Sequence, residues 1–243
     1  MELRGRVALV TGAGQRLGRA IAAALAGRGM RLAIHYHNSD TGARELQREI
    51  VAAGGDAECF GADLGDAAAA RALPGRVVAH FGALDVLVNS AAVMHHLSFD
   101  ETTIEQWNEV LDLNLRSVFF CTQGAAAALR AARGKVVNLA DLGGLEPWPG
   151  YAAHSVSKAG VVMLTKVLAR SLAPEVTVNA IAPGTVLVPD SYDAAERRRL
   201  AEATPLGRLG EPKDATDAIL YLLERGDFVT GEILVVDGGR LLR

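Results

Sequence analysis

The sequence predicts an α/β protein built on an open, doubly wound parallel sheet of seven strands, with helices on both faces. Short apolar runs alternate with longer helical patterns along all 243 residues, which is typical of parallel strands joined by crossover helices. The runs are mostly continuous rather than alternating, as expected of strands covered on both faces. Since one large α/β domain fits this length, at roughly 150 residues per domain, we predict a single domain over residues 1–243.

The predicted elements follow one another in a regular order. We expect strands at the runs RVALVT (6–11), RLAIHY (31–36), AECFGA (57–62), LDVLVN (84–89), KVVNLA (135–140), VTVNAI (176–181) and EILVVD (232–237). The intervening patterns predict helices over 17–28, 41–53, 76–81, 103–131, 151–173 and 213–224. Pro74 and Gly75 interrupt the third connection, so the helix expected there is short.

The connection between Pro183 and Pro212 is the longest one without a clear pattern. Prolines and glycines surround the charged run AAERRRLAEA within it. Loops of this length are usually functional lids or disordered segments. We favour a short helix in a substrate lid at about residues 186–205, with a solvated surface insertion as the alternative.

Charge and composition exclude several classes of function. The 25 Lys and Arg residues against 28 Asp and Glu give a net charge of −3, so no positive field recruits nucleic acid or an acidic membrane. Two cysteines exclude a disulfide framework and a cysteine-rich metal site, and we expect no metal. No apolar stretch approaches about 18 residues and no cleavage signal is present, so we expect a cytoplasmic protein.

A glycine-bearing turn follows the first predicted strand. The strand runs directly into TGAGQRLG (11–18), and a helical pattern begins at about Leu17. Such a turn lets backbone amides approach a pyrophosphate at the positive end of the helix dipole. The sequence therefore predicts a Rossmann-type dinucleotide site that includes Gly12, Leu17 and Gly18.

At this turn the sequence resembles the short-chain dehydrogenase/reductase family, whose usual turn reads TGxxxGxG. The resemblance extends over nearly the whole chain, through Asp63-Leu64, NSAA (89–92), Asn114, the Lys158 helix, Pro183-Gly184 and VTGEILVVDGG (229–239). Arg16 replaces the middle glycine of the turn. Together with HYHNS after the second strand, that replacement resembles the pteridine reductase branch of the family.

The end of the second strand bears on the choice of cofactor. NAD sites generally place a carboxylate there to hold the ribose 2′-hydroxyl, whereas NADP sites need cations for the 2′-phosphate. This chain has His37, Asn38 and Ser39 there, with no acid before Asp40. Arg16 can point at the same place, so we expect NADP(H).

The resemblance implies further cofactor contacts. All of them fall at the carboxyl ends of predicted strands, where open α/β sheets bind their ligands. The residues implied are Asp63 and Leu64 for the adenine, Asn89, Ser90 and Ala91 along the cofactor, Lys158 for the ribose, and Pro183, Gly184 and Thr185 for the nicotinamide carboxamide.

The resemblance also implies the chemistry, with two departures from the family pattern. The family transfers hydride between nicotinamide and a carbonyl or imine, and a YxxxK tyrosine, a preceding serine and an asparagine assist. Lys158 and Asn114 match the lysine and the asparagine. His154 stands at the tyrosine position and Asp141 at the serine position. The aspartate is a further resemblance to the pteridine reductases, which also have aspartate at that position.

We hypothesise that an Asp141–His154 pair replaces the serine and the tyrosine. His154 and Lys158 share one helix face, so both can point at the nicotinamide. Neutral imidazole is a poor proton donor, and the Asp141 carboxylate would favour the imidazolium. Lys158 would then hold the ribose hydroxyls and Asn114 a water. Tyr151 is a rival donor, although we favour it as a wall of the substrate pocket beside Trp148.

The resemblance implies an NADPH-dependent reductase acting on a pterin, a dihydrofolate-like compound or another small carbonyl or imine. A 3-oxoacyl-carrier-protein reductase or general carbonyl reductase is the alternative. A third hypothesis is a non-catalytic NADP(H)-binding protein, because His154 can also mark a site without turnover. The family usually forms tetramers through its two long helices, here 103–131 and 151–173, so we expect a homotetramer.

Overall fold

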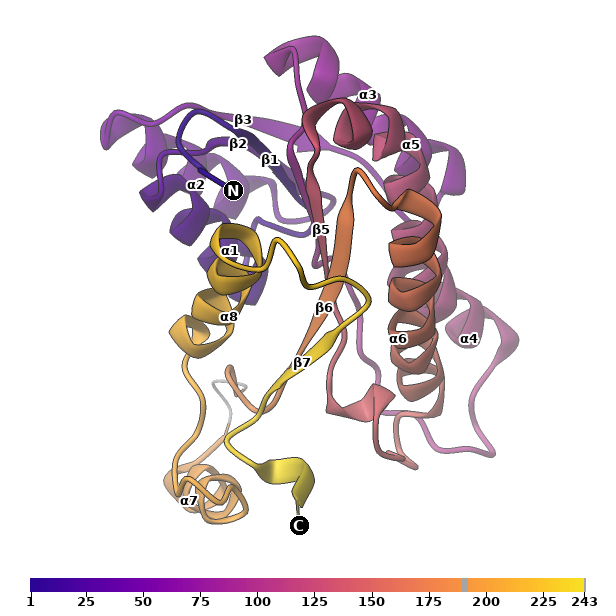
Figure 1. Ribbon diagram of the computed structural model, residues 1–243. Helices are drawn as coiled ribbons and strands as arrows, with labels where there is room; N and C mark the ends of the chain where they lie inside the picture. The colour runs from indigo at the N-terminus through magenta and orange to yellow at the C-terminus, as the bar shows by residue number, and fades with distance from the viewer. Residues whose placement is uncertain (189–191, 243) are drawn as a thin grey trace.

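The computed structural model describes residues 1–188 and 192–242, and its core is a parallel sheet of seven strands (Figure 1). The strand order is β3-β2-β1-β4-β5-β6-β7, which confirms the predicted doubly wound fold. The strands are β1 (Val7–Val10), β2 (Arg31–Tyr36), β3 (Ala57–Gly61), β4 (Val86–Asn89), β5 (Lys135–Leu139), β6 (Thr177–Pro183) and β7 (Ile233–Val236). The order reverses between β1 and β4, which is where such sheets open a ligand crevice.

Helices cover both faces of the sheet (Figure 1). One layer packs around α1, which contacts both α2 and α8, and the other around α5, which contacts α3 and α6. The helices are α1 (Arg16–Gly27), α2 (Asp40–Ala52), α3 (Ala67–Phe81), α4 (Ile104–Leu111), α5 (Ser117–Ala132), α6 (Ala152–Leu172), α7 (Ala194–Glu202) and α8 (Pro212–Glu224). No helix among the described residues is long and apolar enough to cross a membrane.

Strand β1 shows why the apolar runs are continuous. Its side chains alternate between two hydrophobic cores: Ala8 and Val10 lie in the core beneath α1, α2 and α8, and Val7 and Leu9 lie in the core beneath α3, α5 and α6. All four are buried. At the start of the strand, the Val7 N–H donates to Asp85 Oδ2 at 2.8 Å. Burial on both faces removes the polar alternation of a half-exposed strand.

The prediction of a short helix over 76–81 was wrong, because α3 starts at Ala67 and continues through Pro74. Proline inside a helix costs about 3 kcal/mol, since it removes one hydrogen bond and crowds the preceding turn. Here Pro74 is buried, and α3 packs against α5. Gly124 allows that contact to be close, as a Cβ there would lie 2.1 Å from the Arg71 carbonyl oxygen. Tertiary packing therefore outweighs the local preference.

The helical pattern over 103–131 holds, but the helix changes type in the middle. A π-helical turn over Asp112–Arg116 joins α4 to α5, and Asn114 lies in it. Such turns carry one extra residue and frequently occur at functional sites.

Within the predicted lid, residues 192–202 contain one helix. Asp193 caps α7, accepting from the Glu196 N–H while the Glu196 side chain accepts from the Asp193 N–H. The helix lies beyond the carboxyl ends of the strands (Figure 1). Residues 189–191, including Pro189, lie outside the described residues, as does residue 243.

Candidate active site

A cleft of about 920 Å³ lies at the carboxyl ends of the central strands. This is the size of a small-molecule site. The glycine turn, the loops after β4 and β5, the start of α6, the end of β6 and the lid segment all contribute to it. The predicted site residues that line it are Arg16, Leu17, Ser90, Asp141, Trp148, Tyr151, His154, Lys158, Pro183, Gly184 and Thr185.

The glycine turn has the shape of a phosphate cradle. A Cβ on Gly18 would lie 2.2 Å from the Gly12 carbonyl oxygen, so only glycine fits there. No side chain caps the N-terminus of α1. The first N–H groups of a helix need a partner from outside it, and a pyrophosphate supplies one at the positive end of the dipole. The residues present therefore fit the phosphates of a dinucleotide.

Two side chains that sequence reasoning did not assign hold this turn in place. Thr11 Oγ1 accepts from the N–H groups of Ser90 at 2.9 Å and Ala91 at 3.0 Å, joining β1 to the loop after β4. His35 Nδ1 accepts from the Gly12 N–H at 3.0 Å. The only signal in the sequence was the polar His35 inside the apolar run of the second strand.

The buried His35 ring is a neutral, fixed tautomer. Burial lowers its pKa to about 4. With Nδ1 accepting from Gly12, Nε2 carries the proton and donates to the Ala62 carbonyl at 3.1 Å. His35 therefore ties the glycine turn to the end of β3.

Arg16 adopts the backbone conformation that glycine usually supplies. Its φ is +49°, in the left-handed region that costs non-glycine residues roughly 1–2 kcal/mol. Arg16 Nη2 donates to the Leu187 carbonyl at 2.9 Å, so its guanidinium joins the turn to the lid segment. Strain of this kind points to a role for the side chain. Its contact with a 2′-phosphate stays a prediction.

The other residues expected near the adenosine end lie beside the turn. His37 and Asn38 are exposed, and His37 Nδ1 is 3.9 Å from Asp63 Oδ1. Ser39 packs on Gly14, where a Cβ would lie 2.2 Å from Ser39 Oγ. The Leu64 side chain is buried in the core, which leaves its main chain for a ligand.

The Asn89 side chain turns into the protein rather than into the cleft. Its Nδ2 donates to Asn138 Oδ1 at 2.8 Å and to Thr122 Oγ1 at 3.2 Å, and Asn138 in turn donates to Thr165. Asn89 thus ties the central strands to the helices behind them. Its neighbour Ser90 is the residue of this segment that reaches the cleft.

Asn114 anchors the loop after β4 at the edge of the cleft. Its Oδ1 accepts from the Val93 N–H at 2.8 Å, and its Nδ2 donates to the Val93 carbonyl at 2.9 Å and to Ser157 Oγ at 3.1 Å. The π-helical turn directs this amide toward both the loop after β4 and α6. Asn114 is therefore a positioning residue, and its contact with a water stays a prediction.

His154 and Asp141 are in direct contact. His154 Nε2 lies 2.5 Å from Asp141 Oδ2, and the histidine side chain is only 4% exposed. His154 Nδ1 lies 3.3 Å from the Val93 carbonyl oxygen. His154 Nδ1 also lies 3.4 Å from Asn114 Nδ2, but the amide hydrogens of Asn114 have shorter contacts with Val93 and Ser157, which leaves Nδ1 to donate to the Val93 carbonyl. Both ring nitrogens then face acceptors, as an imidazolium requires.

The charges around this pair favour an ionised Asp141. Burial raises the pKa of Asp141, but the hydrogen bond from His154 and the charge of Lys158 outweigh it and hold the pKa below its ordinary value. Lys158 Nζ donates to the Leu139 carbonyl at 2.7 Å. Burial lowers the pKa of Lys158, and the Asp141 charge opposes that change. The site thus joins a carboxylate, an imidazole and an ammonium group.

Aromatic side chains form one wall of the cleft. The Trp148 ring stacks on His154, with an interplanar angle of 8° and centroids 6.3 Å apart. Trp148 Nε1 donates to Glu146 Oε1 at 2.9 Å, which fixes the indole. Tyr151 contacts His96 edge to face, with ring centroids 5.0 Å apart. Two aromatic rings, Trp148 and Tyr151, with planes 69° apart, therefore lie next to the polar pair.

Comparisons with known proteins agree with this geometry. Residues 12–240 match a protein family described as enoyl-(acyl carrier protein) reductase. The chain is 35% identical to a 3-oxoacyl-[acyl-carrier-protein] reductase of Synechocystis sp., covering 99% of this chain and 98% of the relative. It is 37% identical to a 3-oxoacyl-[acyl-carrier-protein] reductase of Staphylococcus aureus, covering 96% of each. A crystal structure of a blue fluorescent protein from a metagenomic library in complex with NADPH superposes with a TM-score of 0.92 at 29% identity, over 99% of both chains.

Proposed function

The chain belongs to the short-chain dehydrogenase/reductase family, and on that premise we propose that it is an NADPH-dependent reductase of a carbonyl or imine bond. The contact between His154 Nε2 and Asp141 Oδ2, beside Lys158 in the cleft, carries this proposal. It supplies a proton donor at the position where the family has tyrosine. The pteridine reductase branch has no support from the relatives compared, whose names favour the 3-oxoacyl alternative.

The residues of the cleft have separate roles in the proposed reaction. Bound NADPH supplies the hydride. The proton shared by His154 and Asp141 goes to the substrate oxygen or nitrogen, and the carboxylate stabilises the imidazolium before transfer. Lys158 holds the ribose hydroxyls, and Trp148 with Tyr151 excludes water from one side of the substrate.

NADPH is favoured over NADH by the charge at the adenosine end. The end of β2 lacks a carboxylate before Asp40, and that side chain is engaged by Arg44. His37 and Ser39 lie beside the turn as donors, and Arg16 would serve as a third by turning from its contact with the Leu187 carbonyl toward β2. A 2′-phosphate carries up to two negative charges, so this surface suits it better than a hydroxyl.

Replacing Arg16 tests the cofactor assignment. Arg16→Ala is expected to raise the KM for NADPH about tenfold and the KM for NADH less than threefold, because one charged hydrogen bond to a phosphate is lost. Steady-state kinetics with both cofactors measures this. Arg28→Ala removes a cation from the other end of α1, where Arg28 pairs with Glu224, and serves as the control. Equal weakening of NADPH and NADH would reject the assignment.

Two substrate classes are supported by different observations. The printed names of the relatives favour a 3-oxoacyl thioester. Asp141 beside the aromatic wall of Trp148 and Tyr151 favours a flat ring with an imine, such as a dihydropterin.

Assays of the purified protein with NADPH decide between them. Steady NADPH oxidation with an acetoacetyl thioester but not with dihydrobiopterin assigns the first class, and the converse assigns the second. Binding of NADPH without turnover of either compound, or of a broad carbonyl panel, would reject the reductase and leave a non-catalytic NADP(H)-binding protein.

We also propose that the chain forms a homotetramer. Large apolar side chains are exposed along the outer sides of α4, α5 and α6, namely Ile104, Trp107, Phe119, Val156, Met163 and Val167. Exposed apolar patches of this kind mark contact surfaces. Light scattering of the purified protein is expected to give four times the chain mass of 25.5 kDa, and a monomeric mass would contradict the proposal.

A further inference from the structure

A second guanidinium reaches the cleft from the C-terminal end of the chain. After β7 the chain turns back through Gly238 and Gly239, both with positive φ, into a short 3-10 turn that begins at Arg240. Both carboxylate oxygens of Asp237 hold this turn, accepting from the Gly239 N–H at 2.7 Å and the Leu241 N–H at 2.8 Å. Arg240 is thereby directed at the cleft, where Nη1 donates to Thr185 Oγ1 at 2.7 Å.

Arg240 has no counter-charge in the described part of the chain. No described carboxylate forms an ion pair with its guanidinium, and both Asp237 oxygens accept from backbone N–H groups. Among the described residues, the cleft lining holds the cations Arg16, Lys158 and Arg240 and one carboxylate, Asp141, which already contacts His154. A half-buried cation is costly without a partner. The cleft is therefore electrostatically prepared for an anion.

The contact with Thr185 shapes this place for an anion. Because Thr185 Oγ1 accepts from Arg240, the hydroxyl hydrogen is free to donate to a ligand. The guanidinium has further N–H groups in a planar fork that matches a carboxylate. The dinucleotide phosphates have their own donors at the start of α1, which follows β1 in the middle of the sheet. Arg240 instead follows β7 at the edge.

We propose that Arg240, held by Thr185 beside the expected place of the nicotinamide carboxamide, forms a subsite for an anionic group of the substrate, so that the preferred substrates are carbonyl or imine compounds that carry a carboxylate. The inference rests on the proposed reductase function and narrows its substrate class. Arg240 is then a specificity-determining residue that contacts substrate.

A matched pair of substrates tests the subsite. Acetoacetate and ethyl acetoacetate share one ketone and differ in the carboxylate, which the ester lacks. Wild-type protein is expected to prefer the acid in kcat/KM. Arg240→Gln is expected to lower the acid-to-uncharged ratio at least tenfold, and Arg240→Lys to restore part of it, because a charged hydrogen bond contributes roughly 10- to 100-fold.

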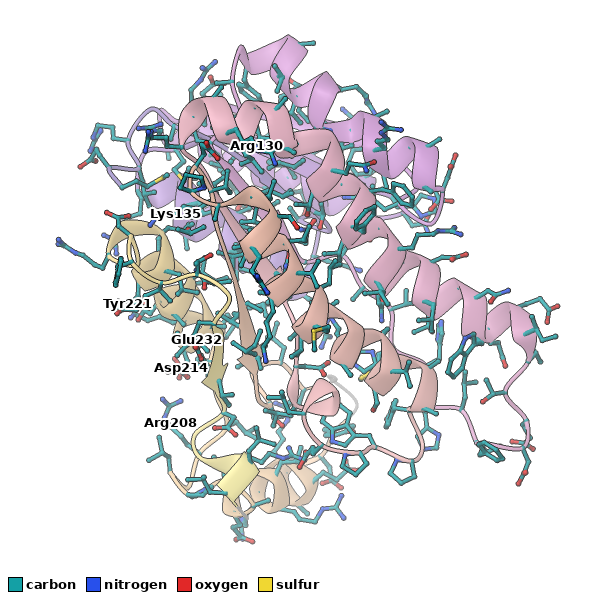
Figure 2. All side chains as sticks on the ribbon, turned by 45° about the vertical axis from the view of Figure 1, so that its right-hand side comes forward. Arg130, Lys135, Arg208, Asp214, Tyr221 and Glu232 are labelled. Carbon is teal, nitrogen blue, oxygen red and sulfur yellow. The ribbon has the colours of Figure 1, made fainter. Side chains whose placement is uncertain are left out.

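Arg208→Gln is the matched control. Arg208 is a guanidinium near β7 that pairs with Asp214 outside the cleft lining, at 2.7 and 2.8 Å (Figure 2). Its substitution is expected to leave the acid-to-uncharged ratio within about twofold, as is usual for exposed pairs. An unchanged ratio in Arg240→Gln would overturn the proposal. A rise in the KM for NADPH with no change in the ratio would also overturn it, by assigning Arg240 to the cofactor.

Direct binding separates this inference from the reductase proposal. If neither acetoacetate nor ethyl acetoacetate is turned over, and the acetoacetyl thioester, dihydrobiopterin and the carbonyl panel also fail, the reductase proposal fails. Calorimetric titration of acetoacetate into NADP⁺-loaded protein still tests the subsite in that case. Weaker binding in Arg240→Gln than in wild type and Arg208→Gln would support the subsite. Equal binding in all three, or none in wild type, would overturn it.

Discussion

His154→Phe is expected to lower kcat by about 10²- to 10⁴-fold, the usual contribution of a positioned proton donor. Phenylalanine keeps an aromatic ring against Trp148, so the packing of the site is largely retained. The dissociation constant for NADPH, measured by fluorescence titration, is expected to change little, because the glycine turn and Lys158 remain. The combination of lost turnover and retained binding identifies a chemical role.

Asp141→Asn tests the other member of the pair. The amide keeps the volume and an acceptor for His154 Nε2 but removes the charge that favours the imidazolium. We expect a smaller loss of kcat than in His154→Phe, about 10- to 100-fold, with little change in the dissociation constant for NADPH. A kcat equal to that of wild type would reject the pair.

Tyr151→Phe serves as the control for the rival donor. If His154 and Asp141 supply the proton, this variant keeps kcat within about threefold, as expected for a wall residue. A large loss in Tyr151→Phe, with activity retained in His154→Phe, would assign the proton to the phenol. His154→Tyr restores the family residue, and activity gained only in that variant would mean that the natural chain binds cofactor without turnover.

The second large effect concerns stability against acid. The pKa of His35 is lowered by burial from 6.5 to about 4 in the folded protein. Between these values the unfolded chain binds a proton that the folded chain does not, so the free energy of unfolding falls as pH falls. At about 1.4 kcal/mol for each pH unit, His35 alone accounts for a loss of about 3 kcal/mol between pH 6.5 and pH 4. Its contribution is fully present above pH 6.5.

Urea unfolding across this pH range measures the effect against matched variants. His35→Asn keeps an acceptor for the Gly12 N–H but cannot titrate, so we expect it to be less stable at pH 7 and to lose less stability between pH 6.5 and pH 4. His37→Asn removes an exposed histidine from the same strand end and should retain most of the wild-type slope. Parallel curves for wild type and His35→Asn would contradict the assignment.

Much of the fold could be predicted because local pattern and tertiary environment agree. The apolar runs became strands since both faces of the sheet are covered, as β1 shows with its four buried residues. The helix prediction failed at Pro74 because the free-energy cost of a proline inside a helix is local. The packing of α3 against α5 depends instead on Gly124, which lies on another helix. A pattern confined to one segment does not report such a contact.

In the site, motif spacing placed Asp141, His154 and Lys158, since helix geometry and strand ends fix their positions. It did not reveal what Arg16 contacts, because Leu187 is 171 residues away in a segment without pattern. Arg240 was missed for a related reason. Its direction depends on the Asp237 carboxylate folding the last turn back, and a single arginine near a chain end carries no signal of its own.

Because β1 is buried on both faces, its hydrophobic pattern does little to fix the register of the strand in the sheet. A slide by one residue would exchange Val7 and Leu9 for Ala8 and Val10 between two cores that are both apolar, so hydrophobicity alone opposes it weakly. Polar contacts at either end oppose such a slide as well: Asp85 accepts from the Val7 N–H at the start, and Thr11 accepts from the Ser90 and Ala91 N–H groups at the finish. The clamp at the finish also shapes the cofactor turn.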